Sequence, residues 1–102
     1  IYHMYMTIKA DIQGFEWDQG NSVKNLKKHG ISTIETEEIF LDEHLKVEID
    51  IKHSESEQRY IAFGKTQKER VLFVVFTMRQ GKIRIVSSRI ANQKEKLKYD
   101  QA

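Results

Sequence analysis

The sequence of 102 residues contains no cysteine, no proline and only five glycines. Without cysteine there is no disulfide, zinc ribbon or thiol chemistry, and this composition fits the reducing cytosol. No apolar run is long enough to cross a bilayer, and the first residues lack the basic-then-apolar layout of a signal peptide. We therefore expect a cytoplasmic protein that does not enter a membrane, with residues 1–102 forming one domain around one core.

The short motifs of common enzyme classes are also missing. There is no P-loop, no glycine-rich dinucleotide loop, no GxSxG and no HExxH. The four histidines have no i,i+4 partner and no metal-ligand spacing. We interpret them as surface or capping residues and expect neither a metal nor another cofactor. Carboxylate pairs such as Glu55 and Glu57 are interpreted as solvated charge.

Charge is distributed unevenly along the chain. Residues 1–50 hold five basic and ten acidic side chains, whereas residues 51–102 hold twelve basic and five acidic ones. The second half contains all the arginines: Arg59, Arg70, Arg79, Arg84 and Arg89. This asymmetry is compatible with a polyanionic partner for the second half. Mutual attraction between the two halves of a mixed surface is the simpler explanation of the charge pattern alone.

Residues 59–89 organise the chain, because they have the pattern of three antiparallel strands joined by two tight turns. The middle strand, residues 71–78, is apolar and rich in β-branched and aromatic side chains, which is typical of a strand covered on both faces. Residues 67–70 and 80–81 mark the turns, and Gly81 can adopt a positive φ there.

Two-residue loops at both turns would fix the register of these strands. Phe76 would then lie opposite Ile61 and Ile85, and Val74 opposite Phe63, all on one face. The opposite face would carry the alternate residues of the three strands: Tyr60, Ala62, Gly64, Phe73, Val75, Thr77, Arg84, Val86 and Ser88. A slip of one residue would exchange the faces.

Outside residues 59–89, the sequence predicts two more strands and three helices. A first strand ends near Trp17, and residues 21–29 form a helix that stops at Gly30. A capping-box pattern at Ser32 begins a second short helix to about residue 40. Residues 46–51 alternate as a strand, and Asn92 caps a last helix to about Tyr99. The predicted fold is α+β: an antiparallel sheet of four to five strands with two N-terminal helices and a C-terminal helix.

The chemistry that remains possible is the binding of a phosphate by strand arginines. RNA can be cut when a base removes the 2′-hydroxyl proton, cations stabilise the charged phosphorane and an acid protonates the leaving oxygen. The planar fork of arginine suits the phosphate. Arg84, beside Thr77, is a candidate for this phosphate contact. Arg59, Arg79 and Arg89 lie near strand ends. A single strand arginine is more often only solvated, so the grouping carries the hypothesis.

Two segments resemble a known family. The first is Phe15-Glu-Trp-Asp18 with Asn25-Leu-Lys-Lys-His-Gly30. The second contains Arg59, Gly64, Arg70-Val-Leu, Lys82-Ile-Arg-Ile-Val-Ser-Ser-Arg-Ile-Ala91, Glu95 and Tyr99. Together, over about residues 15–100, they resemble the BrnT family of bacterial toxins. The matching positions are Trp17, Asp18, Asn25, Lys28, His29, Gly30, Arg59, Gly64, Arg70, Arg84, Ser87, Arg89, Glu95 and Tyr99.

The resemblance implies a RelE-like fold and a ribonuclease toxin of a type II toxin–antitoxin system that halts translation. It also implies a BrnA-type antitoxin, a DNA-binding protein that neutralises the toxin and represses the operon with it. One position departs from the family, which usually has a lysine where this chain has Asn21. A non-catalytic binding module, or a degenerate toxin kept for operon control, is therefore an alternative hypothesis.

From this comparison we predict a metal-free endoribonuclease with two groups of site residues. Arg84 and Arg89 would clamp the phosphate, and Glu95 or Tyr99 would transfer a proton. The RNA-binding groove would contain Arg59, Arg79, Lys28 and His29. Lys28 and His29 join the site only if their helix ends beside the sheet rim.

Overall fold

The protein was analysed as a computed structural model, which describes residues 14–101 except 19, 21–23, 25–26 and 55. Its centre is a five-stranded sheet with the order β1-β5-β4-β3-β2. The strands are β1 (Gly14–Trp17), β2 (Lys46–Ile49), β3 (Tyr60–Lys65), β4 (Val71–Arg79) and β5 (Lys82–Ile90). The helices are α3 (Thr33–Glu38), α4 (Gln93–Asp100) and the 3₁₀-helices η1 (Ile39–Leu41) and η2 (Ile51–His53). The predicted α+β class is confirmed.

The sheet is mixed rather than wholly antiparallel. Strands β2 to β5 are antiparallel, as predicted, whereas β1 pairs in parallel with β5. β1 and β5 are far apart in the sequence, and the chain between them includes helices. A long connection of this kind permits parallel pairing, whereas a tight hairpin does not. The earlier part of the predicted first strand and most of the predicted helix of residues 21–29 lie outside the described residues, although residues 27–29 are helical.

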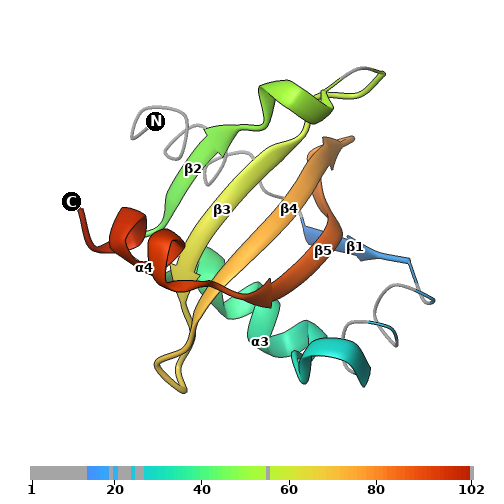
Figure 1. The fold of residues 1–102 in the computed structure, drawn as a ribbon. Coiled ribbons are helices and arrows are strands. Elements are labelled where there is room, and N and C mark those ends of the chain that lie inside the picture. The colour runs from blue at the N-terminus through green and yellow to red at the C-terminus, as the bar shows by residue number, and fades with distance from the viewer. Residues whose placement is uncertain (1–13, 19, 21–23, 25–26, 55, 102) are drawn as a thin grey trace.

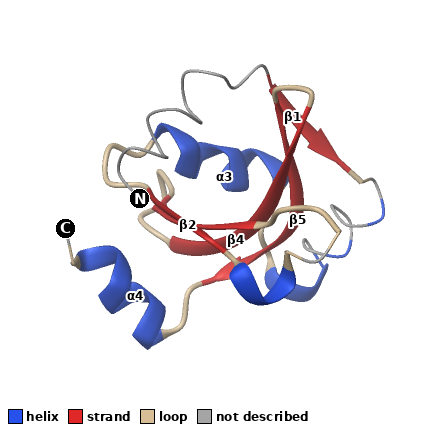
Figure 2. Ribbon diagram, turned by 90° about the horizontal axis from the view of Figure 1, so that it is seen from above, coloured by secondary structure: helices blue, strands red, loops and turns tan. Residues whose placement is uncertain are grey.

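Helices α3 and α4 cover opposite faces of the sheet (Figures 1 and 2). On the α3 face, Ile39 and Phe40 pack on buried side chains of the central strands, including Val74 and Phe76. On the α4 face, Tyr99 packs with a smaller buried group: Phe63, Val71 and Ala91. The apolar middle strand is thus covered on both faces, as its composition predicts. Helix α4 covers only part of its face (Figure 1).

Both predicted capping residues are confirmed. The Ser32 hydroxyl accepts a hydrogen bond from the Glu35 N–H at 3.1 Å, which begins α3. Asn92 and Glu95 form a complete capping box at the start of α4. The Glu35 carboxylate, however, does not complete a capping box with Ser32. It is buried and accepts hydrogen bonds from Arg70 and Thr66, which tie α3 to the β3–β4 turn.

The predicted register of β3 is wrong by one residue. Tyr60, not Ile61, lies opposite Phe76, and Ala62, not Phe63, lies opposite Val74. The reason is a three-residue loop, residues 67–69, in which Glu69 has a φ of 63° and the Thr66 N–H donates to the Arg70 carbonyl at 2.9 Å. A left-handed third residue is the usual closure of such a loop. Side chains of β3 therefore exchange faces, and Tyr60 stacks on Phe76 in the core.

The predicted register of β4 and β5 is confirmed near their turn. Phe76 lies opposite Ile85 and Thr77 opposite Arg84 across the loop of Gln80 and Gly81, which both have positive φ. Beyond Phe76 a β-bulge shifts the pairing. An extra residue on one strand changes which side chains face each other. Consequently Ser88 turns into the α3 face, where it accepts a hydrogen bond from the Thr36 hydroxyl at 2.9 Å.

Candidate functional site

One end of the α4 face is not covered by α4 and carries a band of charged side chains. Strand β4 contributes Thr77 and Arg79, β5 contributes Arg84, and Arg59 directly precedes β3. The loop of residues 50–59 and the β4–β5 turn lie together at this end, away from α4 (Figure 1). Alternation along paired strands places Thr77, Arg79 and Arg84 on the same face.

Three adjoining open hollows follow this end of the sheet. We call them together the arginine groove. Its lining residues are Glu16, Lys52, His53, Ser56, Glu57, Arg59, Thr77, Arg79, Gln80, Arg84, Ile85 and Val86. Arg59, Arg79 and Arg84 each line two of the hollows, and Glu57 lines all three. Three arginines therefore surround the carboxylate of Glu57 in the groove, and Glu16 adds a second carboxylate in one hollow.

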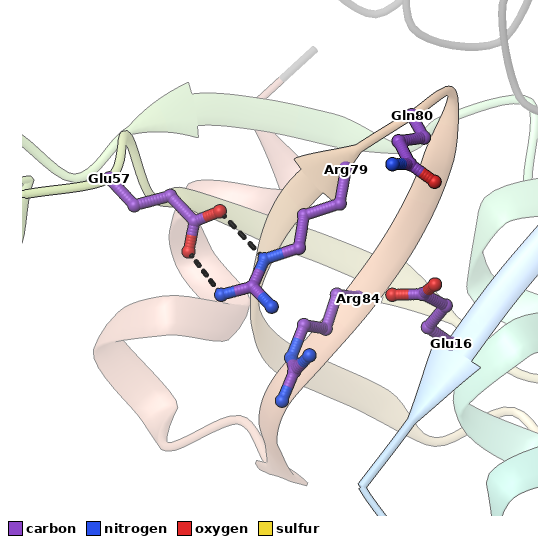
Figure 3. A pocket seen from close by; sticks show the side chains of 5 residues that line it. All are labelled: Glu16, Glu57, Arg79, Gln80 and Arg84. Atoms are coloured by element: carbon purple, nitrogen blue, oxygen red, sulfur yellow. Dashed lines mark hydrogen bonds and ion pairs between the residues drawn. The ribbon is translucent and has the colours of Figure 1, made fainter.

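Arg79 and Glu57 form a bidentate ion pair within the groove (Figure 3). The guanidinium Nε lies 2.8 Å from Oε2 of Glu57, and a terminal nitrogen lies 3.0 Å from Oε1. The hydrogen bonds from Arg79 lower the pKa of Glu57, and the charges of Arg84 and Arg59 add to this effect. Both side chains are well exposed, at 46% and 38%. Water can therefore compete for the pair, which makes it a weak contact by itself.

Arg84 projects from β5 beside Arg79, with Glu16 of β1 on its other side (Figure 3). Within the described part of the chain, its side chain has no hydrogen bond or ion pair, and this also holds for the guanidinium of Arg59. Thr77, opposite Arg84, is 2% exposed, and its hydroxyl has no hydrogen-bond partner among the described residues. Buried polar atoms are rarely left unpaired, so this hydroxyl is available to a water molecule or a ligand at this end of the sheet.

A closed loop carries the acidic wall of the groove. At its base, the Asp50 N–H donates to the Arg59 carbonyl at 2.9 Å, and the Arg59 N–H donates to the Ser54 hydroxyl at 2.9 Å. Within it, the imidazole Nδ1 of His53 lies 3.0 Å from a carboxylate oxygen of Asp50. These contacts hold His53 and Glu57 on the same side of the sheet end, where they line one hollow with Arg59.

The structure brings together only part of the predicted catalytic set. Arg89 lies opposite Phe73, four positions along β4 from Thr77, or about 13 Å at ordinary strand spacing. Its guanidinium stacks on the Phe73 ring at 4.0 Å and forms a bidentate pair with Glu95 at 2.7 and 2.8 Å. Arg84 and Arg89 therefore share a face but lie at different ends of it, and the charge of Arg89 is already neutralised.

Tyr99 is buried under α4 and points away from the arginine groove. Its hydroxyl donates to Oδ2 of Asp42 at 2.6 Å. Burial, followed by this hydrogen bond to Asp42, raises the pKa of Tyr99 well above the ordinary value for tyrosine. A phenol in this setting holds its proton firmly and stabilises the docking of α4. Glu95 is equally engaged, since it accepts from Arg89 and from the Asn92 N–H.

Lys28 and His29 lie at the opposite end of β4 from Arg79. They directly precede Gly30, whose carbonyl accepts a hydrogen bond from Arg70 at 3.1 Å. Arg70 stands before the first residue of β4, whereas Arg79 is its last. The helix that carries Lys28 and His29 thus ends beside the sheet, but at the other rim, and the structure does not bring these two residues to the groove.

Sequence reasoning missed Glu57, His53 and Glu16. From the sequence, Glu57 is interpreted as solvated charge and His53 as a surface or capping residue, because neither belongs to a motif with catalytic or metal-ligand spacing. Glu57 meets Arg79 across 22 positions of sequence. Glu16 meets Arg84 only through the parallel register of β1 and β5. The described residues include no group of three or more metal-ligating side chains. The groove offers instead arginine forks, which suit the binding of a phosphodiester, with the carboxylates of Glu57 and Glu16 beside them.

Comparisons with known proteins identify the family and the fold of the chain. A family model described as "Ribonuclease toxin, BrnT, of type II toxin-antitoxin system" matches residues 17–95. The crystal structure of the Brucella abortus ribonuclease toxin BrnT shares the fold. It has a TM-score of 0.60 at 22% identity, over 78% of this chain and 97% of that one. A comparison with curated proteins finds no match. No helix of the described part is long and apolar enough to cross a membrane. The chain belongs to the BrnT family, the ribonuclease toxins of type II toxin–antitoxin systems.

Proposed function

We propose that this chain is a metal-independent endoribonuclease that holds an RNA phosphate in the arginine groove. The observation that carries the proposal is the convergence of Arg59, Arg79 and Arg84 on one open end of the sheet. Cations aimed at a phosphate stabilise the charge that develops as a neighbouring 2′-oxygen attacks it. The groove can supply this stabilisation with side chains alone.

Arg84 and Arg59 are the first contacts for the phosphate. Both line the groove, and neither guanidinium is engaged by another described residue. Arg79 is a third cation, but RNA must compete with Glu57 for its fork. The Thr77 hydroxyl, buried directly opposite Arg84, adds a hydrogen bond to a phosphate oxygen once Arg84 turns toward the ligand. A mixed set of one hydroxyl and three guanidinium groups suits a backbone phosphate rather than a particular base.

Cutting RNA accounts for the proposed biological effect, which is the arrest of translation. The proposed partner is a BrnA-type antitoxin, a DNA-binding protein that neutralises the toxin and represses the operon in complex with it. Family membership supports this partnership. Helix α4 is the proposed place of contact, because its Leu97 side chain is 58% exposed. We expect the antitoxin to cover α4 or the sheet beside it, and hydrogen exchange at residues 92–100 should slow in the complex.

The test is cleavage of total bacterial RNA by the purified chain in the presence of EDTA. We expect fragments from the wild type and a loss of about 10²- to 10³-fold in kcat/KM for Arg84→Ala, as when one donor to a developing anion is removed. Arg84→Lys should recover only part of the rate, because lysine lacks the planar fork. Lys68→Ala, in the exposed β3–β4 turn, is the control for loss of a positive charge.

Intact RNA with the wild type, or activity that EDTA abolishes, would contradict the proposal. The alternative is then a non-catalytic or degenerate module that binds nucleic acid or its partner and acts in operon control. The departure at Asn21, which lies outside the described residues, is the observation that favours this alternative. Binding of RNA without cleavage, lost in Arg84→Ala, would support it.

A further inference from the structure

Glu57 holds the central position of the arginine groove. It lines each of the three hollows, whereas Glu16 lines only the one beyond Arg84. Arg79 binds it through both carboxylate oxygens, and the charges of Arg59 and Arg84 act on it as well. A phosphate held by Arg59 and Arg84 would therefore lie beside an ionised carboxylate. The geometry of the groove pairs its cations with a group able to accept a proton.

His53 lines the hollow that Glu57 and Arg59 also line. Its Nδ1 lies 3.0 and 3.2 Å from the two oxygens of Asp50. A carboxylate only accepts hydrogen bonds, so this contact fixes a proton on Nδ1 and leaves Nε2 for another partner. The side chain of Asp50 is 12% exposed, whereas that of His53 is 60% exposed. A largely covered carboxylate thus orients an accessible imidazole, an arrangement that suits a histidine that transfers protons.

We propose that Glu57 and His53 are the general base and the general acid of the arginine groove. This inference rests on the proposed ribonuclease function and supplies the proton transfers that the arginines cannot. Both residues come from the loop that Ser54 closes onto the Arg59 backbone, so one short segment brings the two groups to the hollow that Arg59 also lines. The charged residues that line the groove with this pair or contact it are Arg59, Arg79, Arg84, Lys52, Asp50 and Glu16.

The reaction balances with these two groups. Glu57 accepts the proton of the 2′-hydroxyl while the 2′-oxygen forms a bond to phosphorus. The bond from phosphorus to the 5′-oxygen breaks, and Nε2 of His53 delivers a proton to that oxygen. The products are a 2′,3′-cyclic phosphate and a free 5′-hydroxyl end. Glu57 then releases its proton to water and His53 regains one, so the cycle consumes no net proton.

The first experiment measures cleavage of a mixed-sequence RNA in EDTA by Glu57→Gln and His53→Gln. Each variant should lose about 10²- to 10⁴-fold in kcat, the usual contribution of a positioned acid or base. Binding of the same sequence with 2′-O-methyl sugars, which cannot be cleaved, should stay within a few-fold of the wild type. The controls are Glu43→Gln and His44→Gln, which make the same changes at exposed positions outside the groove.

The pH profile separates proton transfer from a merely structural effect. Wild-type kcat/KM should follow a bell-shaped curve. Glu57→Gln should remove the acid limb, His53→Gln should remove the alkaline limb, and Glu57→Asp should restore part of the rate. Product ends should be 2′,3′-cyclic phosphate and 5′-hydroxyl.

Three results would overturn the inference while leaving the proposed function in place. Both variants could cleave normally although the wild type is active in EDTA. Glu57→Gln could cleave faster, which would make Glu57 only a competitor of RNA for Arg79 and not a general base. Glu16→Gln could lose activity while Glu57→Gln keeps it, which would move the base to β1. An inactive wild type would instead contradict the proposed function itself.

Discussion

The two ends of the α4 face contain the same kind of contact with different surroundings. At each end an arginine of the central hairpin forms a bidentate pair with a glutamate: Arg89 with Glu95 under α4, and Arg79 with Glu57 in the groove. The Glu95 side chain is 15% exposed, whereas that of Glu57 is 38% exposed. The same kind of arginine–glutamate pair can therefore hold a helix or stay accessible to a ligand, and the exposure of the carboxylate decides which.

Glu95 is held in place by the fold. It accepts from Arg89 and from the Asn92 N–H, its own N–H bonds the Asn92 side chain, and Arg89 rests on Phe73. The only hydrogen-bond partner of the Glu57 side chain in the described part of the chain is Arg79. A ligand can displace a single exposed pair at little cost, but it cannot displace a pair shared with a helix cap. We call the end with the arginine groove the open end and the end beneath α4 the closed end. The open end can bind a ligand, whereas the ion pair at the closed end holds α4 in place.

The largest expected effect distinguishes Arg84 from Arg89. Arg84→Ala should lose about 10²- to 10³-fold in RNA cleavage with little change in melting temperature, because its side chain forms no hydrogen bond or ion pair with another described residue. Arg89→Ala should keep cleavage near the wild-type rate below its melting temperature and unfold more easily, because Glu95 loses its partner. Cleavage kinetics and thermal unfolding of both variants test this difference. A folded Arg89→Ala that fails to cleave would restore Arg89 as a phosphate clamp.

The second prediction concerns the closed end alone. Tyr99→Phe removes the donor to Asp42 and leaves that carboxylate half-buried beneath α4. A hydrogen bond to a charged group contributes about 1.5–3 kcal/mol, so we expect a loss of this size in the free energy of unfolding. Urea denaturation measures it, and cleavage per folded molecule should not change. Reduced turnover in the folded variant would instead favour Tyr99 as a proton donor.

How far the sequence predicts each end depends on the range of the contacts. The capping box at Asn92 and the turn at Gly81 are local, and both follow from residue type. The face of Arg84 follows from that turn, since the register stays regular between it and Thr77. The left-handed Glu69 and the bulge between Val75 and Phe76 carry no glycine or proline signal. The register of β3, which depends on Glu69, and the pairing of β5 beyond the bulge therefore could not be found. Glu57 could not be found either, because only loop closure brings it to Arg79.

The third prediction concerns how the stability of the end beneath α4 depends on pH. Burial alone would raise the pKa of Asp42, but hydrogen bonds from Tyr99 and from the His44 and Lys65 N–H groups together lower it. The Arg89 pair, against the effect of burial, lowers the pKa of Glu95. A lowered pKa in the folded state means stability that is present above the ordinary carboxylate values, 3.8 for Asp42 and 4.5 for Glu95, and is lost as pH falls through the lowered values.

Urea denaturation from pH 7 to pH 3 measures this loss. The wild type should lose stability below about pH 5, where unfolded carboxyl groups begin to bind protons. Glu95→Gln should lose less over the same interval, because one of the contributing carboxylates is gone. Equal slopes for the two proteins would show that the Arg89 pair does not contribute to the pH dependence.

The smallest effect comes from neutralising the two glutamates at neutral pH. Glu95→Gln keeps the shape of the side chain but loses its charge, which weakens both the pair with Arg89 and the helix cap, by about 1 kcal/mol in the free energy of unfolding. Glu57→Gln should leave unfolding unchanged, because water already competes for its pair with Arg79. Parallel urea denaturation of the two variants measures the difference. If Glu57→Gln were as destabilising as Glu95→Gln, the groove pair would be part of the fold, and RNA could not readily displace Glu57 from Arg79.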